Sequence, residues 1–172
     1  KEGDYIIDVC AAPGGKSIHL AEMLRGTGHV QARDLTDYKV GLIQENIFRS
    51  GLTNIEAVAW DATVLHEESK EKADIVIADL PCSGLGVLGK KTDLKYKMTE
   101  AMQNDLVKLQ RQMLQVVNAY VKPGGKLLYS TCTIHKDENE GNTAWFLKNY
   151  PEFKLVKEKQ MLPGIDGGDG FY

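Results

Sequence analysis

Residues 5–17 read YIIDVCAAPGGKS, an apolar run of strand length followed by a turn with two adjacent glycines. A strand, a glycine turn and then a helical period are typical of the first β-α unit of an α/β fold. The ending Gly-Lys-Ser is also how a phosphate-binding loop, G-x-x-x-x-G-K-[ST], ends. Cys10 stands where that loop needs its first glycine, and Pro13 removes an amide donor and fixes φ inside it. We therefore expect the start of an α/β fold and a poor triphosphate loop.

The alternation of strand-length apolar runs with helix-period segments continues along the chain. Strands are expected at 5–9, 30–32, 55–59, 74–79 and 126–130, and helices at 17–24, 38–49, 100–120 and 138–149, ahead of an apolar run at 153–156. Residues 74–79 are apolar between two acids, as expected of a central strand covered on both faces. This pattern predicts an α/β, doubly wound, mainly parallel sheet with helices on both faces.

Two of the expected helices carry apolar residues on one face, and the stripe on the longer helix predicts core packing. The shorter stripe consists of Leu42, Ile43, Ile47 and Phe48, and the longer one of Met102, Leu106, Leu109, Met113, Val116, Val117 and Tyr120. Thr99 is the expected N-cap of the longer helix. Residues 82–98 are the one long irregular segment that we expect.

Candidate binding residues follow the ends of several expected strands. They are the turn 10–16 and the acids Asp34, Asp61 and Asp79. In an open α/β sheet the carboxyl ends of the strands share one edge, so these residues should converge. Asp34 follows the glycine turn by roughly 20 residues, where an acid accepts hydrogen bonds from ribose hydroxyls.

The glycines of the turn restrict the kind of cofactor. A dinucleotide site needs G-x-G-x-x-G, but the turn has only Gly14 and Gly15. This favours a cofactor without a pyrophosphate, whose sulfonium and amino-acid group lie over the turn, namely S-adenosylmethionine. The predicted cofactor-binding residues are Cys10, Ala11, Ala12, Pro13, Gly14, Gly15, Lys16, Asp34, Asp61 and Asp79.

Two cysteines also follow expected strands. Cys82 comes after Pro81 in the loop behind 74–79, and Cys132 lies in Ser-Thr-Cys-Thr behind 126–130. Two thiols at neighbouring strand ends suggest a nucleophile and a helper, although burial as a small residue is the usual role of a single cysteine. There is no C-x-x-C pair and no histidine at ligand spacing, so neither a zinc site nor a disulfide framework is expected.

Four motifs, taken together, resemble a known family. DVCAAPGGK (8–16), DLPCSGLG (79–86), KPGGKLLYSTCTI (122–134) and LPGIDGGDGFY (162–172) resemble, in order and spacing, the motifs of the Sun/Fmu family of RNA cytosine carbon-5 methyltransferases. The resemblance covers essentially the whole chain and is closest to bacterial members that act on small-subunit (16S) ribosomal RNA. It implies a Rossmann-like methyltransferase fold, S-adenosylmethionine as cofactor and RNA as substrate.

The family pattern also sets two expectations about the extent of the chain and one about a departure. Family members have an N-terminal helical RNA-binding domain and a final strand beyond Phe171 and Tyr172. We therefore expect residues 1–172 to be a fragment of the catalytic domain with its C-terminal strand truncated. Arg33, beside Asp34, stands where the family more often has an apolar residue.

The resemblance also implies roles for individual residues. Carbon 5 of cytosine is a poor nucleophile, so a thiolate must first add to carbon 6. The Thr-Cys motif assigns this addition to Cys132, and Cys82 then assists elimination. Lys16 is the candidate for favouring the thiolate, and Asp79 for protonating or hydrogen-bonding ring nitrogen 3. The reverse assignment stays open, because Pro-Cys carries the nucleophile in DNA cytosine methyltransferases.

The segment 89–97, GKKTDLKYK, is the candidate RNA contact. The target base must leave its stack to react, which favours single-stranded or loop RNA. Lysines can contact its backbone, and an aromatic ring can stack on a base. An ordinary solvated lysine loop is the alternative. The predicted RNA-binding residues are Lys90, Lys91, Lys95, Tyr96 and Lys97.

Composition limits the class of protein. With 172 residues, 42% hydrophobic and 26% charged, the chain can build one domain. The net charge of −3 is not that of a typical nucleic-acid binder, so RNA binding would need a local patch. We expect a soluble, cytoplasmic monomer whose partner is RNA, with no metal and no membrane. A P-loop nucleotide-binding enzyme and a non-catalytic domain that binds RNA or cofactor are the alternatives.

Overall fold

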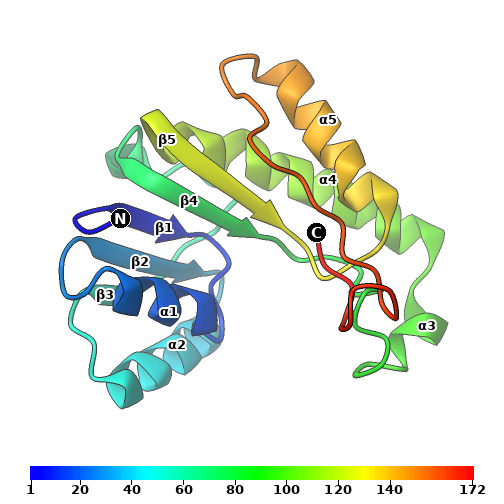
Figure 1. Ribbon diagram of the computed structural model, residues 1–172, viewed down its shortest axis with the longest axis horizontal. Coiled ribbons are helices and arrows are strands. Elements are labelled where there is room, and N and C mark those ends of the chain that lie inside the picture. Colours follow the sequence, from blue (N-terminus) through cyan, green and yellow to red (C-terminus); the bar gives the residue numbers. More distant parts are fainter. The chain divides into compact units, whose positions relative to one another are not determined.

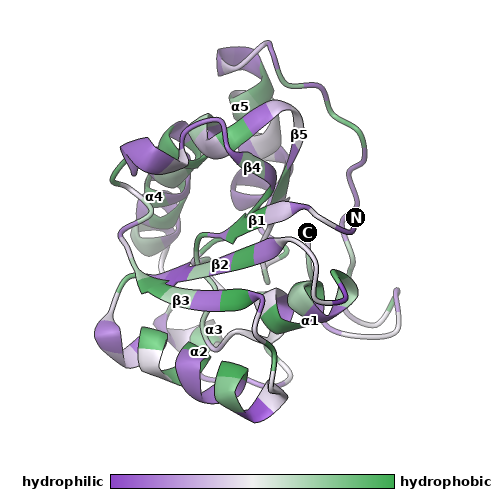
Figure 2. Cartoon of the chain, turned by 90° about the vertical axis from the view of Figure 1, so that its left-hand side faces the viewer, coloured by the Kyte–Doolittle hydropathy of each residue, from purple (hydrophilic) through white to green (hydrophobic). Residues whose placement is uncertain are grey.

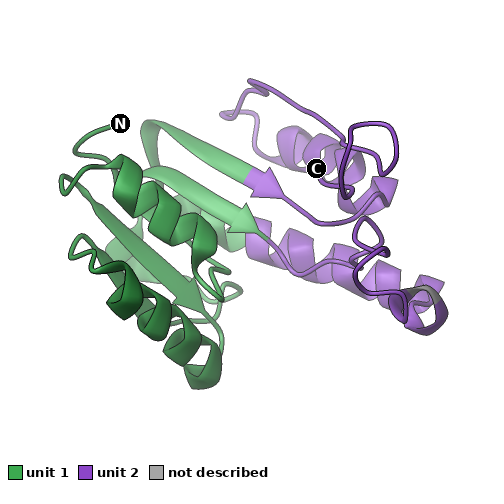
Figure 3. Cartoon of the chain, turned by 60° about the horizontal axis from the view of Figure 1, so that its bottom comes forward, with its two compact units in different colours: residues 1–79, 115–128 green, residues 80–114, 129–172 purple. Residues whose placement is uncertain are grey.

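The computed structural model describes residues 1–172, with the side chain of Lys95 outside the description. The chain forms two compact units, which Figure 3 distinguishes by colour. Unit 1 comprises Lys1–Asp79 and Gln115–Leu128, and unit 2 comprises Leu80–Leu114 and Tyr129–Tyr172. Among the described residues, no helix is both long enough and apolar enough to cross a bilayer.

The sheet has five strands in the order β3-β2-β1-β4-β5 (Figure 1). The pairs β1–β2, β1–β4 and β2–β3 are parallel, which confirms the predicted fold class. The strand order reverses direction between β1 and β4, and ligands bind such sheets at the carboxyl ends of the strands at this point. The strands are β1 (Tyr5–Asp8), β2 (His29–Asp34), β3 (Ile55–Ala59), β4 (Ala73–Asp79) and β5 (Val121–Ser130), whose last two residues belong to unit 2.

Helices α1 (Gly15–Met23) and α2 (Asp37–Ser50) pack on one face of the sheet (Figure 1). Their apolar side chains join those of the strands in one core, which includes Ile6, Ala21, Leu24, Val30, Ala32, Ile43 and Ile77. Figure 2 shows both apolar and polar residues along α2, whose buried side chains Val40 and Ile43 lie on one face of the helix. Thr36 caps its start by accepting a hydrogen bond from Lys39 N at 3.3 Å, and Gly51 ends it with φ 69°.

Phe48, one residue of the predicted stripe on α2, does not lie on the face of the helix that packs against the sheet. Ile43 is fully buried, but the Phe48 side chain is 87% exposed. The two residues are five positions apart, or about 140° around a helix, so both cannot face the same core. The prediction that Phe48 shares a helical face with Ile43 was therefore wrong.

The remaining helices are α3 (Leu94–Lys97), α4 (Glu100–Val117) and α5 (Glu140–Asn149), with short 3₁₀ turns η1 (Glu67–Ser69), η2 (Asn118–Tyr120) and η3 (Lys136–Glu138). Thr99 caps α4 as predicted, because its hydroxyl accepts a hydrogen bond from Met102 N at 3.3 Å. Met102 itself is 47% exposed, which corrects the predicted stripe. The buried side chains of α4 within unit 2 are Val107, Gln110, Met113 and Leu114.

The C-terminal part of unit 2 has little regular structure. Residues 151–160 form no strand, so the apolar run at 153–156 does not continue the sheet. Met161 and Phe171 form an isolated antiparallel bridge. Tyr172 exchanges two backbone hydrogen bonds with Thr131, at 3.1 and 3.2 Å.

Candidate active site

The glycine turn is fastened to the ends of the neighbouring strands. Ala11 N donates to Arg33 O at 2.8 Å, Ala12 N to Asp34 Oδ2 at 3.0 Å and Gly14 N to Ala11 O at 2.7 Å. These are amides that a phosphate-binding loop would direct at its ligand. Because these three amides bond within the protein and Pro13 has no N–H, residues 11–14 do not supply the amide donors that a triphosphate loop needs.

Gly14 is required by the turn for its backbone conformation. Its φ is 105°, a region that L side chains rarely adopt, and an added Cβ would lie 3.2 Å from Ile43 Cγ2. At Gly15, by contrast, a Cβ would meet no atom within 4 Å, outside its own helix and chain neighbours. The protein's own backbone and packing therefore explain why residue 14 is glycine but not why residue 15 is.

Asp34 links the end of β2 to this turn. Its carboxylate accepts hydrogen bonds from Ala12 N at 3.0 Å and Leu35 N at 2.8 Å, and forms an ion pair with Lys39 Nζ at 3.0 Å. The side chain is almost fully buried. A carboxylate has about four acceptor positions, so this one can still accept from a ribose hydroxyl.

Arg33, which departs from the family pattern, does not reach this side of the sheet. Successive side chains of a strand point to opposite faces, so Arg33 and Asp34 diverge. The buried Arg33 guanidinium donates to Ser69 Oγ at 2.5 Å and to Gln31 Oε1, and lies over the Tyr120 ring at 5.1 Å. The Arg33 side chain therefore packs on the opposite face of the sheet and does not displace the Asp34 carboxylate.

The two acids at the ends of β3 and β4 have different surroundings. Asp61 Oδ1 accepts hydrogen bonds from Thr63 N at 2.8 Å and Thr63 Oγ1 at 2.7 Å, which closes the turn after β3. Asp79 Oδ2 lies 2.6 Å from Lys16 Nζ, and both side chains are partly exposed. This ion pair connects the start of α1 to the end of β4, where the strand order reverses.

Asp8 was missed by the sequence analysis. Its carboxyl is buried at the end of β1, where Ser17 Oγ donates to Oδ2 at 2.7 Å while Oδ1 has no hydrogen-bond partner. Burial raises its pKa to about 6. Burial also raises the pKa of the Cys10 thiol to about 12, so Cys10 is a neutral thiol rather than a nucleophile.

In unit 2, the structure brings the two predicted thiols together. Cys82 Sγ lies 3.1 Å from Cys132 Sγ, and Cys132 N donates to Cys82 Sγ at 3.2 Å. The hydrogen bond with Cys132 raises the pKa of the Cys82 thiol, and burial raises it further. Cys82 is therefore a protonated thiol at neutral pH, beside the sulfur of Cys132.

The loops that carry these thiols are joined along their backbones. Leu80 N donates to Ser130 O at 3.2 Å, and Gly86 N donates to Cys132 O at 3.1 Å. Gly86 also contacts Gly170 closely, since an added Cβ would lie 2.0 Å from Gly170 O. Two of the motifs quoted from the sequence, 79–86 and 162–172, thus meet in the structure.

A family profile described as "16S rRNA methyltransferase RsmB/F" matches residues 1–172. The chain belongs to the RsmB/F family. A curated relative, the probable ribosomal RNA small subunit methyltransferase B of Bacillus subtilis (strain 168), is 38% identical over 190 residues, which cover 100% of this chain. The RsmB/F chain described here spans 42% of the length of that relative.

Two solved structures agree with the assignment. The crystal structure of PH0851 has a TM-score of 0.95 and 36% identity, covering 99% of this chain and 42% of the other. NSun6 from Pyrococcus horikoshii, solved with the S-adenosylmethionine analogue SFG, has a TM-score of 0.88 and 31% identity, covering 98% of this chain and 46% of the other. The RsmB/F family depends on S-adenosylmethionine, which confirms the cofactor predicted from the turn.

The lysine segment of this RsmB/F chain differs from the expected open loop. Lys97 lies with Tyr96 in helix α3 and pairs with Asp93 at 2.8 Å, while Lys90 pairs with Asp169 at 2.6 Å. Tyr96 is 84% exposed. Lys91 is exposed, and the predicted contact Lys95 lies outside the described side chains. RNA binding by these residues stays a prediction.

Proposed function

We propose that the protein containing this chain transfers a methyl group from S-adenosylmethionine to carbon 5 of a cytosine in RNA, with 16S ribosomal RNA as the substrate. The observation that carries the proposal is the 3.1 Å approach of the Cys82 and Cys132 sulfurs in a chain of the RsmB/F family. A covalent route to carbon 5 needs one thiol to attack and a second group to manage protons. The RNA substrate implies action in the cytoplasm.

In the proposed mechanism, Cys132 is the nucleophile. Its thiolate forms a bond to carbon 6 of the cytosine, which makes carbon 5 electron-rich. Bound S-adenosylmethionine supplies the methyl group as an electrophile. After the carbon-5 proton is lost to a base, the bond between Cys132 and carbon 6 breaks and the thiolate leaves. Cys82, which remains protonated beside it, donates a hydrogen bond to the departing sulfur.

The residues of unit 1 are proposed to bind the cofactor and the base. The turn 10–16, Asp34 and Asp61 would hold S-adenosylmethionine, with Asp34 accepting from the ribose hydroxyls. Asp79 is proposed to hydrogen-bond ring nitrogen 3, and Lys16 to favour the thiolate. Because Lys16 and Asp79 pair with each other in this structure, these roles require the two side chains to exchange partners on ligand binding.

The decisive experiment is methylation of unmodified 16S ribosomal RNA by the full-length protein, with the product nucleotide mapped. We expect 5-methylcytosine as the product. We also expect an increase in intact mass when RNA containing 5-fluorocytosine is used, because fluorine replaces the carbon-5 proton and cannot be lost to a base, so the covalent adduct persists. Cys132→Ser should abolish the adduct, whereas Cys82→Ser should accumulate it on normal RNA. The opposite pattern would show that the two thiols have exchanged roles, and neither product nor adduct would refute the proposal.

A thermal-shift comparison separates this function from the P-loop alternative. Binding of S-adenosylmethionine should raise Tm, since a ligand that binds the folded state stabilises it. ATP with Mg²⁺ should not, because the turn amides are already bonded to Arg33, Asp34 and Ala11. Stabilisation by ATP alone would overturn the assignment of this turn.

A further inference from the structure

Cys82 is fixed from both sides by two buried side chains of unit 2. Gln110 Nε2 on α4 donates to Pro81 O at 2.8 Å, and Ser83 N donates to Glu138 Oε2 at 2.9 Å. Gln110 Nε2 also donates to Glu138 Oε2 at 2.9 Å, so the two side chains are hydrogen-bonded to each other. The residue before the thiol and the residue after it are therefore held by the same pair.

Cys132 is fixed in the same way by Asn139, the residue after Glu138. Thr131 Oγ1 donates to Asn139 Oδ1 at 2.6 Å, and Asn139 Nδ2 donates to Thr133 O at 3.0 Å. Ser83 Oγ and Thr133 Oγ1 lie 2.7 Å apart and connect the two loops directly. Two consecutive residues thus each hold one of the two thiol loops.

Stability alone does not account for Glu138. Its side chain is 0% exposed, and Oε1 has no hydrogen-bond partner. His135 Nδ1 lies 3.8 Å from Oε1, and it too has no hydrogen-bond partner among the described residues. A buried carboxylate with an unsatisfied oxygen costs free energy, whereas its other oxygen accepts from the backbone beside Cys82, which points to a geometric role.

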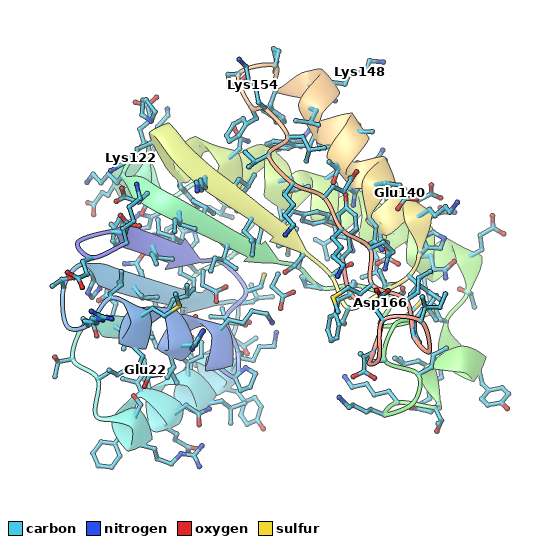
Figure 4. The ribbon with its side chains drawn as sticks, in the orientation of Figure 1. Glu22, Lys122, Glu140, Lys148, Lys154 and Asp166 are labelled. Carbon is cyan, nitrogen blue, oxygen red and sulfur yellow. The ribbon has the colours of Figure 1, made fainter. Side chains whose placement is uncertain are left out.

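We propose that Glu138 and Asn139 are positioning residues that set the separation of the two reacting thiols, Glu138 acting on Cys82 and Asn139 on Cys132. Figure 4 shows the neighbouring Glu140 at the start of α5, which follows directly from this pair. The distance between the two thiols matters because misplacing a reacting group by about 1 Å can reduce a reaction rate about 10²-fold. The inference rests on the proposed methyl transfer for its kinetic consequences but not for its geometry.

The geometric part is tested without RNA, with a trivalent arsenical. Phenylarsine oxide condenses with two adjacent thiols to form two arsenic–sulfur bonds, and its oxygen leaves as water. We expect the full-length protein to bind one equivalent through Cys82 and Cys132. Glu138→Gln replaces the carboxylate that accepts from Ser83 N and Gln110 Nε2 by a neutral amide oxygen, a weaker acceptor. Asn139→Asp loses the donor to Thr133 O. Each change should therefore weaken binding of the arsenical about tenfold or more.

The matched control is Glu140→Gln, the same change of acid to amide on an exposed side chain two residues away. It should bind the arsenical as the unchanged protein does. Circular dichroism and S-adenosylmethionine binding by calorimetry establish that each variant is folded. If folded Glu138→Gln and Asn139→Asp both bind the arsenical as tightly as Glu140→Gln, the proposal is wrong.

The kinetic part uses single-turnover methylation with quenched samples. Asn139→Asp should slow formation of the covalent adduct, whereas Glu138→Gln should form it at a normal rate and release product slowly. A loss of general stability would slow both steps equally in both variants, which would contradict the assignment. If the unchanged protein forms no adduct but the arsenical results hold, the proposed function fails and the positioning role stands.

Discussion

The buried carboxyl of Asp8 controls how the stability of unit 1 depends on pH. Its pKa in the folded state is about 6, above the ordinary value of 3.8. Between these values the folded state holds a proton that the unfolded state has lost, so the free energy of unfolding falls as pH rises from about 4 to about 6. Above that range the loss is complete and amounts to about 3 kcal/mol.

Asp8→Asn should remove this loss. The amide keeps an oxygen to accept from Ser17 and carries no charge at any pH. We expect the variant to match the unchanged protein near pH 4 and to be more stable by about 3 kcal/mol above pH 6.5. Chemical unfolding at a series of pH values measures the difference, and a difference that does not change with pH would contradict the explanation.

Gly14 and Gly15 should respond to alanine in different ways. Gly14→Ala should lower the free energy of unfolding by about 1–3 kcal/mol, because its φ of 105° is strained for any other residue. Gly15→Ala should leave Tm unchanged or slightly raised, yet weaken S-adenosylmethionine binding if the cofactor approaches this backbone as proposed. Thermal unfolding and calorimetry separate the two effects, and unchanged cofactor affinity in Gly15→Ala would remove Gly15 from the site.

At the scale of the element, α2 offers a test of which face packs on the sheet. Ile43→Ala should cost about 2–5 kcal/mol, because it opens a cavity under a fully buried side chain. Phe48→Ala should change stability by less than about 0.5 kcal/mol, because that ring is 87% exposed. Urea unfolding of the two variants measures the difference. Equal costs would mean that Phe48 is covered in solution.

The strands and helices differ in how well the sequence predicts them. The periodicity of apolar residues located β3 at its observed residues and α2 to within one residue at each end, because burial on one face requires that period. It placed β2 at 30–32, whereas the strand runs over His29–Asp34, since polar residues such as Arg33 and Asp34 pair in the ladder as well as apolar ones do. It missed the buried face of α4 around Gln110, because a polar residue is buried only when distant residues satisfy it.

In the candidate site, too, features that follow from a sequence pattern were predicted, and features that depend on contacts between distant side chains were not. The shared edge of a parallel sheet predicted that the turn and its acids would gather, and hydrogen bonds and an ion pair do join Asp34 and Asp79 to the turn, whereas Asp61 bonds to Thr63. The partner of Lys16 was not predictable, because the ion pair with Asp79 depends on side-chain positions that no motif specifies. Glu138 and Asn139 were missed for the same reason. Their roles come from contacts with Ser83, Thr131 and Thr133, and the motif they follow names only the cysteine.

At the scale of the whole molecule, the candidate chemistry divides between the two compact units. The residues proposed to bind the cofactor lie in unit 1, and both thiols lie in unit 2. We therefore expect the Cys82→Ala, Cys132→Ala double variant to bind S-adenosylmethionine within about threefold of the unchanged affinity. Asp34→Asn should weaken the binding of S-adenosylmethionine about tenfold, or about 1.4 kcal/mol, because an ionised hydrogen-bond acceptor is lost. Calorimetry on the full-length protein measures both, and loss of binding in the double variant would contradict this division.

The adjacency of Glu138 and Asn139 limits how the chain length can vary during evolution. Each residue reaches a different cysteine loop, so a single inserted or deleted residue between Cys132 and Glu138 would turn both side chains away from their partners at once. We expect homologous proteins to keep this interval constant in length while they accumulate insertions in 151–160, which forms no strand or helix. A family member that retains both cysteines and methylates RNA with a longer interval would contradict this expectation.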